Sequence, residues 1–142
     1  MDTAIATSAR STGRLQAGAL TAARILLGLV FVASGASGFL FLFMSPPPMP
    51  PGLAGTFQDV FFRSHWVQFV DAVELVAGVL LLANRYVALA LTLLGAVLAN
   101  ILFFHLSMQR ETIALPLVVL ALWCALAWQH RASLAPLFRA RS

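Results

Sequence analysis

Residues 66–106 read WVQFVDAVELVAGVLLLANRYVALALTLLGAVLANILFFHL, two apolar runs that are separated by the polar pair Asn84-Arg85. Each run approaches the ~20 predominantly apolar residues that a helix needs to cross a bilayer. We therefore expect spans at about 66–83 and 86–106, joined by a tight turn. Comparable runs at about 22–44 and 112–129 predict two further spans. The predicted fold class is an all-α integral membrane four-helix bundle.

The composition excludes the ordinary classes of soluble protein. Of the 142 residues, 61% are hydrophobic and 10% are charged, whereas soluble domains are about 45–50% apolar and about 25% charged. A single cysteine, Cys124, excludes an intramolecular disulfide and CxxC redox chemistry. The net charge is +4, and every basic side chain is an arginine. Because few charges interrupt the apolar runs, we expect the partner to be the lipid bilayer and not nucleic acid.

The arginines also predict the orientation, because cytoplasmic loops carry an excess of positive charge. Two of them, Arg63 and Arg110, fall on one side of the predicted membrane, each near an acid. The other seven fall on the opposite side: Arg10, Arg14, Arg24, Arg85, Arg131, Arg139 and Arg141. The bias predicts that both termini of this multi-pass membrane protein are cytoplasmic.

The chain divides into a tail, a membrane domain and a second tail. Residues 1–20 are rich in Ala, Ser, Thr and Gly, which predicts a disordered cytoplasmic tail, and residues 132–142 form a basic C-terminal tail. The four spans occupy 21–131, with a proline-rich outer loop at 45–65. Within that loop, Leu53 to Phe62 predicts a short amphipathic segment that lies on the bilayer or caps the bundle. A loop packed on its own side chains is the alternative.

Polar side chains inside the spans are the most informative feature for function. A charge at the centre of a spanning helix costs roughly 2.5–3.5 kcal/mol, so such residues usually have a partner or a function. Asp71 and Glu74 are three residues apart and lie on one helix face. At about 1.5 Å of rise per residue, Asp71 and His105 fall near the outer rim of the membrane. Glu74, Asn100 and Ser37 fall in a layer beneath them. These depths predict a polar ligand-binding pocket that opens to the outer leaflet.

Three interpretations of Glu74 remain open from the residues alone. Its carboxyl group is structural and bonded to Asn100 or to the backbone, or it lines a pocket for a small or lipophilic molecule, or it relays protons or binds a metal. No spacing of His and acidic residues supports a metal site. The sequence contains no catalytic motif, so we do not expect an enzyme that acts on its own. The residues identify no cofactor.

Three motifs together resemble the DoxX and DoxX-like family of small four-helix membrane proteins. They are Arg24–Phe31 followed by Ser34-Gly35, the stretch Glu74–Leu91, and Asn100–His105. The resemblance covers about residues 22–138. Arg24, Glu74, Asn100 and His105 fit the family pattern, whereas Gly38 stands where many members carry a lysine.

This resemblance implies a protein of a bacterial or archaeal inner membrane. It suggests an accessory or lipophile-binding subunit of a quinone-linked membrane redox system, with a quinone or another lipophile as ligand and a membrane oxidoreductase subunit as partner. Glu74 and Asn100 would then bond the head group, and His105 would exchange protons at the mouth of the pocket. One alternative is a non-catalytic scaffold that docks a protein through Pro46–Pro51 or the Arg-rich tail. A second alternative is a small oligomeric transporter.

Overall fold

The computed structural model describes residues 2–45 and 48–140, and over these residues the chain is helical without strands. Pro46 and Pro47, which begin the predicted proline run, lie outside the described residues. The elements in chain order are α1 (Asp2–Leu40), α2 (Leu53–Arg63), α3 (Trp66–Leu82), α4 (Val87–Met108), η1 (Arg110–Thr112), α5 (Ala114–Gln129), α6 (Arg131–Leu134) and η2 (Ala135–Phe138).

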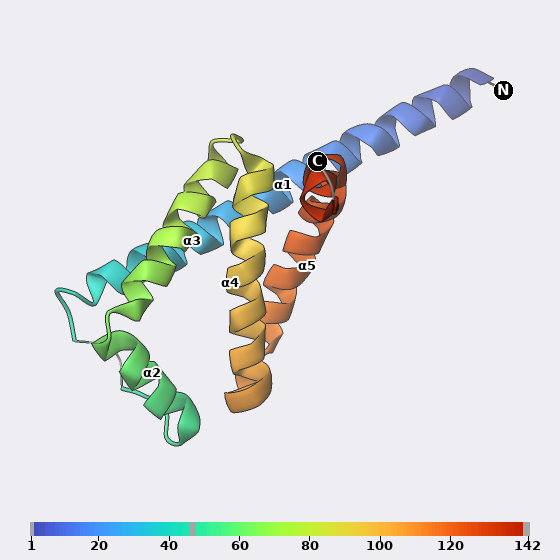
Figure 1. Cartoon of the computed structure of the whole chain (residues 1–142). Helices are drawn as coiled ribbons and strands as arrows, with labels where there is room; N and C mark the ends of the chain where they lie inside the picture. Colours follow the sequence, from blue (N-terminus) through green and yellow to red (C-terminus); the bar gives the residue numbers. More distant parts are fainter. Residues whose placement is uncertain (1, 46–47, 141–142) are drawn as a thin grey trace.

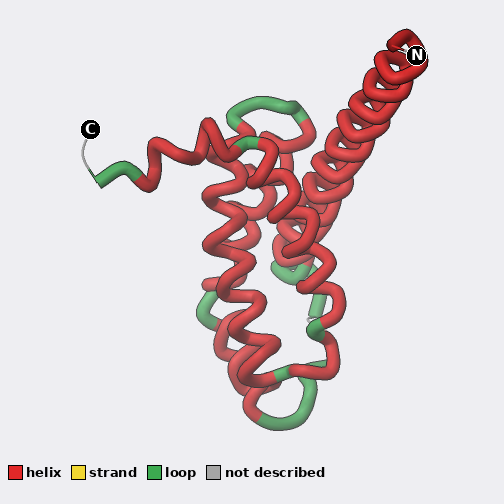
Figure 2. The backbone as a smooth tube through the Cα atoms, turned by 90° about the vertical axis from the view of Figure 1, so that its right-hand side faces the viewer, coloured by secondary structure: helices red, strands yellow, loops and turns green. Residues whose placement is uncertain are grey.

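Four of these helices make up the body of the molecule. Helix α3 packs along the C-terminal half of α1, α4 packs on α3, and α5 contacts both α4 and α1 (Figure 1). The N-terminal half of α1 projects well beyond the other helices, as both views show (Figures 1 and 2). Helix α2 contacts α3 and α4 and lies at the end of the body that is remote from this projection.

Helices α3, α4 and α5 begin and end within two residues of the bounds predicted for the three later spans. The amphipathic segment in the first loop is the helix α2. Residues 2–20 differ from the expected disordered tail, because they form the first half of α1 without a break. Alanine-rich sequence has high helix propensity, and adding residues to an existing helix avoids the cost of nucleation. Residues 131–138 likewise form the short helices α6 and η2.

Within the described part of the chain, two helices, Gly13–Leu40 and Val87–Met108, are long and apolar enough to cross a membrane. The number rises to four if two bent pairs each count as one span. These pairs are α2 with α3, and α5 with α6 and η2, and each is bent by 81°. Large apolar side chains, among them Phe69, Phe103 and Val118, are exposed on the outside of the helices. Soluble monomers rarely expose so much apolar surface, whereas lipid tails would cover it.

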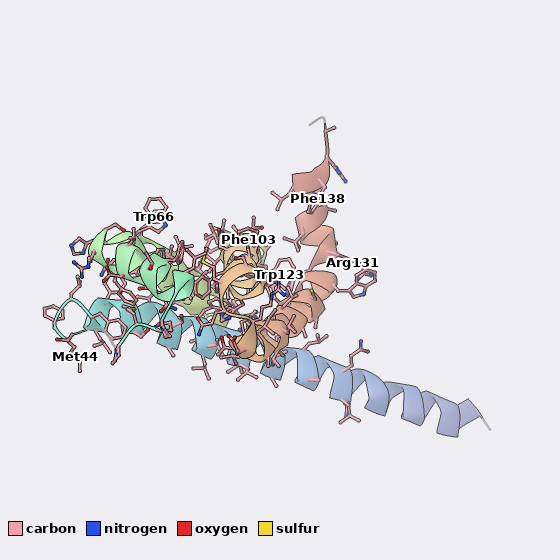
Figure 3. The ribbon with its side chains drawn as sticks, turned by 90° about the horizontal axis from the view of Figure 1, so that it is seen from below. Met44, Trp66, Phe103, Trp123, Arg131 and Phe138 are labelled. Atoms are coloured by element: carbon pink, nitrogen blue, oxygen red, sulfur yellow. The ribbon has the colours of Figure 1, made fainter. Side chains whose placement is uncertain are left out.

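The buried core lies where the four long helices meet. Its largest fully buried side chains come from α1, α3, α4 and α5: Leu27, Phe31, Leu81, Leu91, Leu94, Leu98 and Leu126. Trp123 of α5 closes one side of this core, since its indole Nε1 donates a hydrogen bond to the Leu91 carbonyl at 2.8 Å. Trp66 and Trp128 are exposed near helix ends, and Figure 3 shows Trp66 pointing away from the helices.

Glycines set the distance between α1 and α3. A Cβ atom at Gly78 would lie 2.9 Å from the Gly28 carbonyl oxygen, and one at Gly35 would lie 2.5 Å from the Asp71 carbonyl oxygen. The two backbones therefore touch at these positions, as small residues allow in membrane helix pairs.

Arg24 anchors the other end of the same helix pair. Its guanidinium Nη1 donates to the backbone carbonyls of Leu81 and Leu82, where α3 ends. The last carbonyls of a helix lack partners inside the helix and carry partial negative charge, so a cation stabilises them. The chain then reverses through Asn84 and Tyr86, both with positive φ, which confirms the tight turn predicted at Asn84-Arg85.

The contact between α1 and α3 predicts that Gly35→Ala destabilises the protein. The new methyl group would meet the α3 backbone, which cannot move aside, so we expect a loss of about 1–3 kcal/mol. Gly13→Ala is the matched control, because nothing lies within 4 Å of a Cβ atom there and alanine favours the helix by about 0.5–1 kcal/mol. Thermal unfolding in detergent micelles, followed by circular dichroism, measures both. Equal stability of the two variants would contradict the close contact.

Candidate functional site

A cleft of about 1050 Å³ opens between α2, α3 and α4. Helix α1 contributes Ser34 to its wall, and the end of the loop before α2 contributes Pro48 and Met49. Most of the wall is apolar and aromatic. The polar side chains among the lining residues are few: Ser34, Gln58, Ser64, Asp71, Glu74, Asn100 and His105. An apolar cavity with a small number of polar groups is typical of a small-molecule site.

The two acids of α3 are the most buried polar groups of this cleft. Asp71 is 7% exposed and Glu74 is 4% exposed. Asp71 Oδ2 and Glu74 Oε2 have no hydrogen-bond partner among the described residues, and neither has Gln68 Oε1 one turn earlier. Buried polar groups are normally bonded, and leaving one without a partner costs about 1–3 kcal/mol, more for a charge. The wall of the cleft therefore contains bonding capacity that the described chain does not use, and Asp71 Oδ2 packs against Gly38 of α1.

The position of the two carboxyl groups depends on small residues of α1. A Cβ atom at Gly38 would overlap the Asp71 carboxylate, so the absence of a side chain at Gly38 makes the room that Asp71 fills. Ser34, one turn earlier on α1, is the side-chain hydrogen-bonding neighbour of Glu74. Helix α1 thus holds both acids close to its own backbone.

Asn100 and His105 of α4 also line the cleft, although their side chains do not bond to the acids. The Asn100 amide donates to the Ala96 carbonyl of its own helix at 2.9 Å, so the structure contains no Glu74–Asn100 bond. His105 Nδ1 lies 3.2 Å from the Gln109 carbonyl oxygen and 3.1 Å from Thr112 Oγ1. His105 is thereby held at the end of α4.

Ser37 is a predicted site residue that does not line the cleft. Its hydroxyl donates to the Ser34 carbonyl at 2.7 Å on the exposed side of α1, and it does not line the cleft. Ser34 takes that place. Depth along the helix is similar for the two serines, but three residues correspond to about 300° of rotation, and depth alone does not give the direction of a side chain.

Aromatic side chains of α2 form one wall of the cleft that the sequence did not assign to a site. Phe57 stacks on Phe61, with ring centroids 5.8 Å apart, and reaches Phe104 of α4 at 5.5 Å. Helix α2 is short and apolar on one face, and that face turns toward the cleft. Its amphipathic pattern was visible in the sequence, but the 81° bend against α3 was not.

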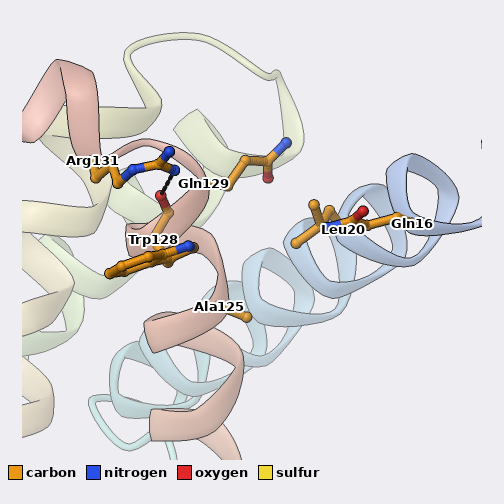
Figure 4. Close-up of a pocket in the computed structure, with 6 residues that line it drawn as sticks. All are labelled: Gln16, Leu20, Ala125, Trp128, Gln129 and Arg131. Carbon is orange, nitrogen blue, oxygen red and sulfur yellow. Dashed lines mark hydrogen bonds between the residues drawn. The ribbon is translucent and has the colours of Figure 1, made fainter. Parts of the chain in front are cut away.

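A second, smaller hollow of about 580 Å³ lies at the other end of the molecule. Figure 4 shows its wall, formed by Gln16 and Leu20 of α1 and by residues around the end of α5. Arg131 donates to the Trp128 carbonyl at 3.0 Å, and its guanidinium lies 5.1 Å from the Trp128 ring centroid. This hollow is open and contains no buried unpartnered group of the described residues.

The charges around the cleft are unbalanced. Its ionisable lining residues are Asp71, Glu74 and His105, with no arginine among them. Nowhere in the described residues do three His, Cys, Asp or Glu side chains come together in a way that suits a metal ion. The cleft can therefore accept hydrogen bonds or a positive charge from a bound molecule.

No protein-family model, curated protein or solved structure matches this chain.

We predict that Glu74→Met raises the stability of the ligand-free protein. Methionine has a similar shape and removes the buried carboxyl group without a partner, so a gain of about 1 kcal/mol or more is expected. Glu111→Met serves as the control, because Glu111 is exposed and such changes usually stay within about 0.5 kcal/mol. The melting temperature in lipid-free micelles gives the comparison. A clear loss of stability in Glu74→Met would mean that Glu74 is structural.

Proposed function

We propose that this chain is an integral membrane protein that binds a lipophilic molecule in the cleft between α2, α3 and α4. The apolar and aromatic wall accommodates the tail, and Asp71 and Glu74 bond to a polar head group that donates hydrogen bonds. The observation that carries the proposal is the pair of buried carboxyl oxygens without partners in a cavity of about 1050 Å³. A bound head group would supply the missing bonds.

The redox setting of the proposal comes from the resemblance to the DoxX family. A quinol is a lipophile whose hydroxyl groups donate hydrogen bonds, so it fits the acceptors of the cleft. We propose an accessory subunit of a quinone-linked membrane system and not an enzyme on its own, because the cleft combines two acids and a histidine without a nucleophile held by a base. His105, at the end of α4, would exchange protons at the mouth.

The proposed topology has four spans in a bacterial or archaeal inner membrane, with both termini in the cytoplasm. Helices α3 and α5 have 17 and 16 residues, close to the shortest length of about 17 that crosses the hydrocarbon core. The exposed positions of Trp66 at the start of α3 and of Tyr86 just before α4 suit the aromatic belts of a bilayer. The Arg24 and Arg85 end would then face the cytoplasm.

Mass spectrometry of small molecules extracted from the purified protein tests the binding function. We expect a defined lipophile in the wild type and its loss from Glu74→Ala, because truncation removes the bonds to the head group. Glu111→Ala, which changes an exposed acid outside the cleft, should retain the lipophile. Only bulk lipids in all three proteins, each still helical by circular dichroism, would refute the proposal.

Reporter fusions test the topology. A cytoplasmically active reporter such as green fluorescent protein, fused after Ser142, should fluoresce, and alkaline phosphatase at the same position should be inactive. A phosphatase inserted after Ser64, between α2 and α3, should be active. Activity of the phosphatase after Ser142 would overturn the proposed orientation.

A further inference from the structure

The charge of the cleft limits which lipophile it can hold. The lining contains two acids and one histidine but no arginine, and the chain contains no lysine. Both acids are more than nine-tenths buried, and one oxygen of each has no partner among the described residues. An acid that stays ionised when buried in a protein is normally paired with a cation or a metal.

Three arginines on or next to the helices that hold or surround these acids are bonded elsewhere. Arg63 of α2 forms an ion pair with Asp59 at 2.8 Å. Arg110, beyond the end of α4, donates to the Leu106 carbonyl at 2.8 Å. Arg24 donates to the last carbonyls of α3, at Leu81 and Leu82, seven residues past Glu74 and so about 10 Å further along the helix. None of the three lines the cleft.

We propose that the natural ligand of the cleft is a lipophilic cation, an amphiphile with an amine or a related cationic head, which Glu74 and Asp71 bind. This inference rests on the proposed lipophile-binding function and specifies a cationic head group in place of the quinol head. A neutral head satisfies the hydrogen bonds of the acids but leaves their charge without a counter-charge. A cationic head supplies both the hydrogen bonds and the counter-charge. The attraction between opposite charges is stronger in a buried site than in water, so a cationic head should bind more tightly than a neutral one.

The aromatic wall supports the same ligand class. Phe57, Phe61 and Phe104 present ring faces and edges along one side of the cleft. Aromatic rings attract a cation that passes over their faces, and they also pack against an alkyl tail. The acids lie on α3 and these rings on α2 and α4, so a ligand with a charged head and an apolar tail can contact both at once.

The test compares two ligands with the same tail in neutral phosphatidylcholine nanodiscs. Dodecylamine is protonated at pH 7.4, whereas 1-dodecanol is a neutral donor of the same chain length. Isothermal titration calorimetry, with empty nanodiscs subtracted, measures both against the full chain. We expect wild type to bind dodecylammonium at least about tenfold more tightly than dodecanol, a difference of about 1.4 kcal/mol.

Charge-neutralising variants locate the site. Glu74→Gln and Asp71→Asn should each reduce the preference for the amine several-fold while dodecanol binding changes little. Asp59→Asn is the matched control, since Asp59 is a paired acid outside the lining and should keep the preference. Circular dichroism and a monodisperse elution profile confirm that each variant is folded.

The other outcomes overturn the inference in distinguishable ways. Equal binding of amine and alcohol by wild type, or recovery of a quinol from the purified protein, removes the charge requirement and leaves the lipophile site intact. Amine binding that is unchanged in both Glu74→Gln and Asp71→Asn places the cation elsewhere. Absence of binding by either ligand, together with only bulk lipid in the extracts, rejects the inference and the proposed function together.

Discussion

The contact between α1 and α3 is the constraint on which the rest of the structure depends. Gly28, Gly35 and Gly78 bring the two backbones into contact, and Arg24 bonds the end of α3 to α1. Lipid tails are as apolar as leucine, so burial of apolar surface contributes little to helix association in a membrane, and close packing has to replace it. The position of α3 against α1 then determines where α4 and α5 pack.

The same contact determines the chemistry of the cleft. Because Gly38 lacks a side chain, the Asp71 carboxylate occupies the space beside α1, and Glu74 lies one turn further along α3. Asp71 packs against Gly38 and Glu74 has the Ser34 side chain beside it, and no arginine lines the cleft to balance the two acids. Such an arrangement reduces stability, and proteins commonly accept that cost at sites where a ligand will provide the missing interactions.

Helix α2 completes the cleft without belonging to the tightly packed body. It meets α3 at a bend of 81° and contributes rings that contact α4 through Phe57 and Phe104. Its contacts with α3 and α4 are few compared with those between α1 and α3. A short helix held mainly by aromatic contacts can move with little loss of buried area, which suits a wall that a ligand has to pass.

The lengths of the apolar runs predicted the later helices and the turn at Asn84-Arg85. The spacing of three residues placed Asp71 and Glu74 on one helix face. Both patterns are local, so they can be read along the chain. The sequence also contained Gln68 on that face, at the same spacing. Tertiary packing, in contrast, placed Ser34 and not Ser37 at the cleft and made α2 one of its walls. Those features depend on helix rotation, on the bend between α2 and α3 and on contacts between distant segments, and no local pattern encodes them.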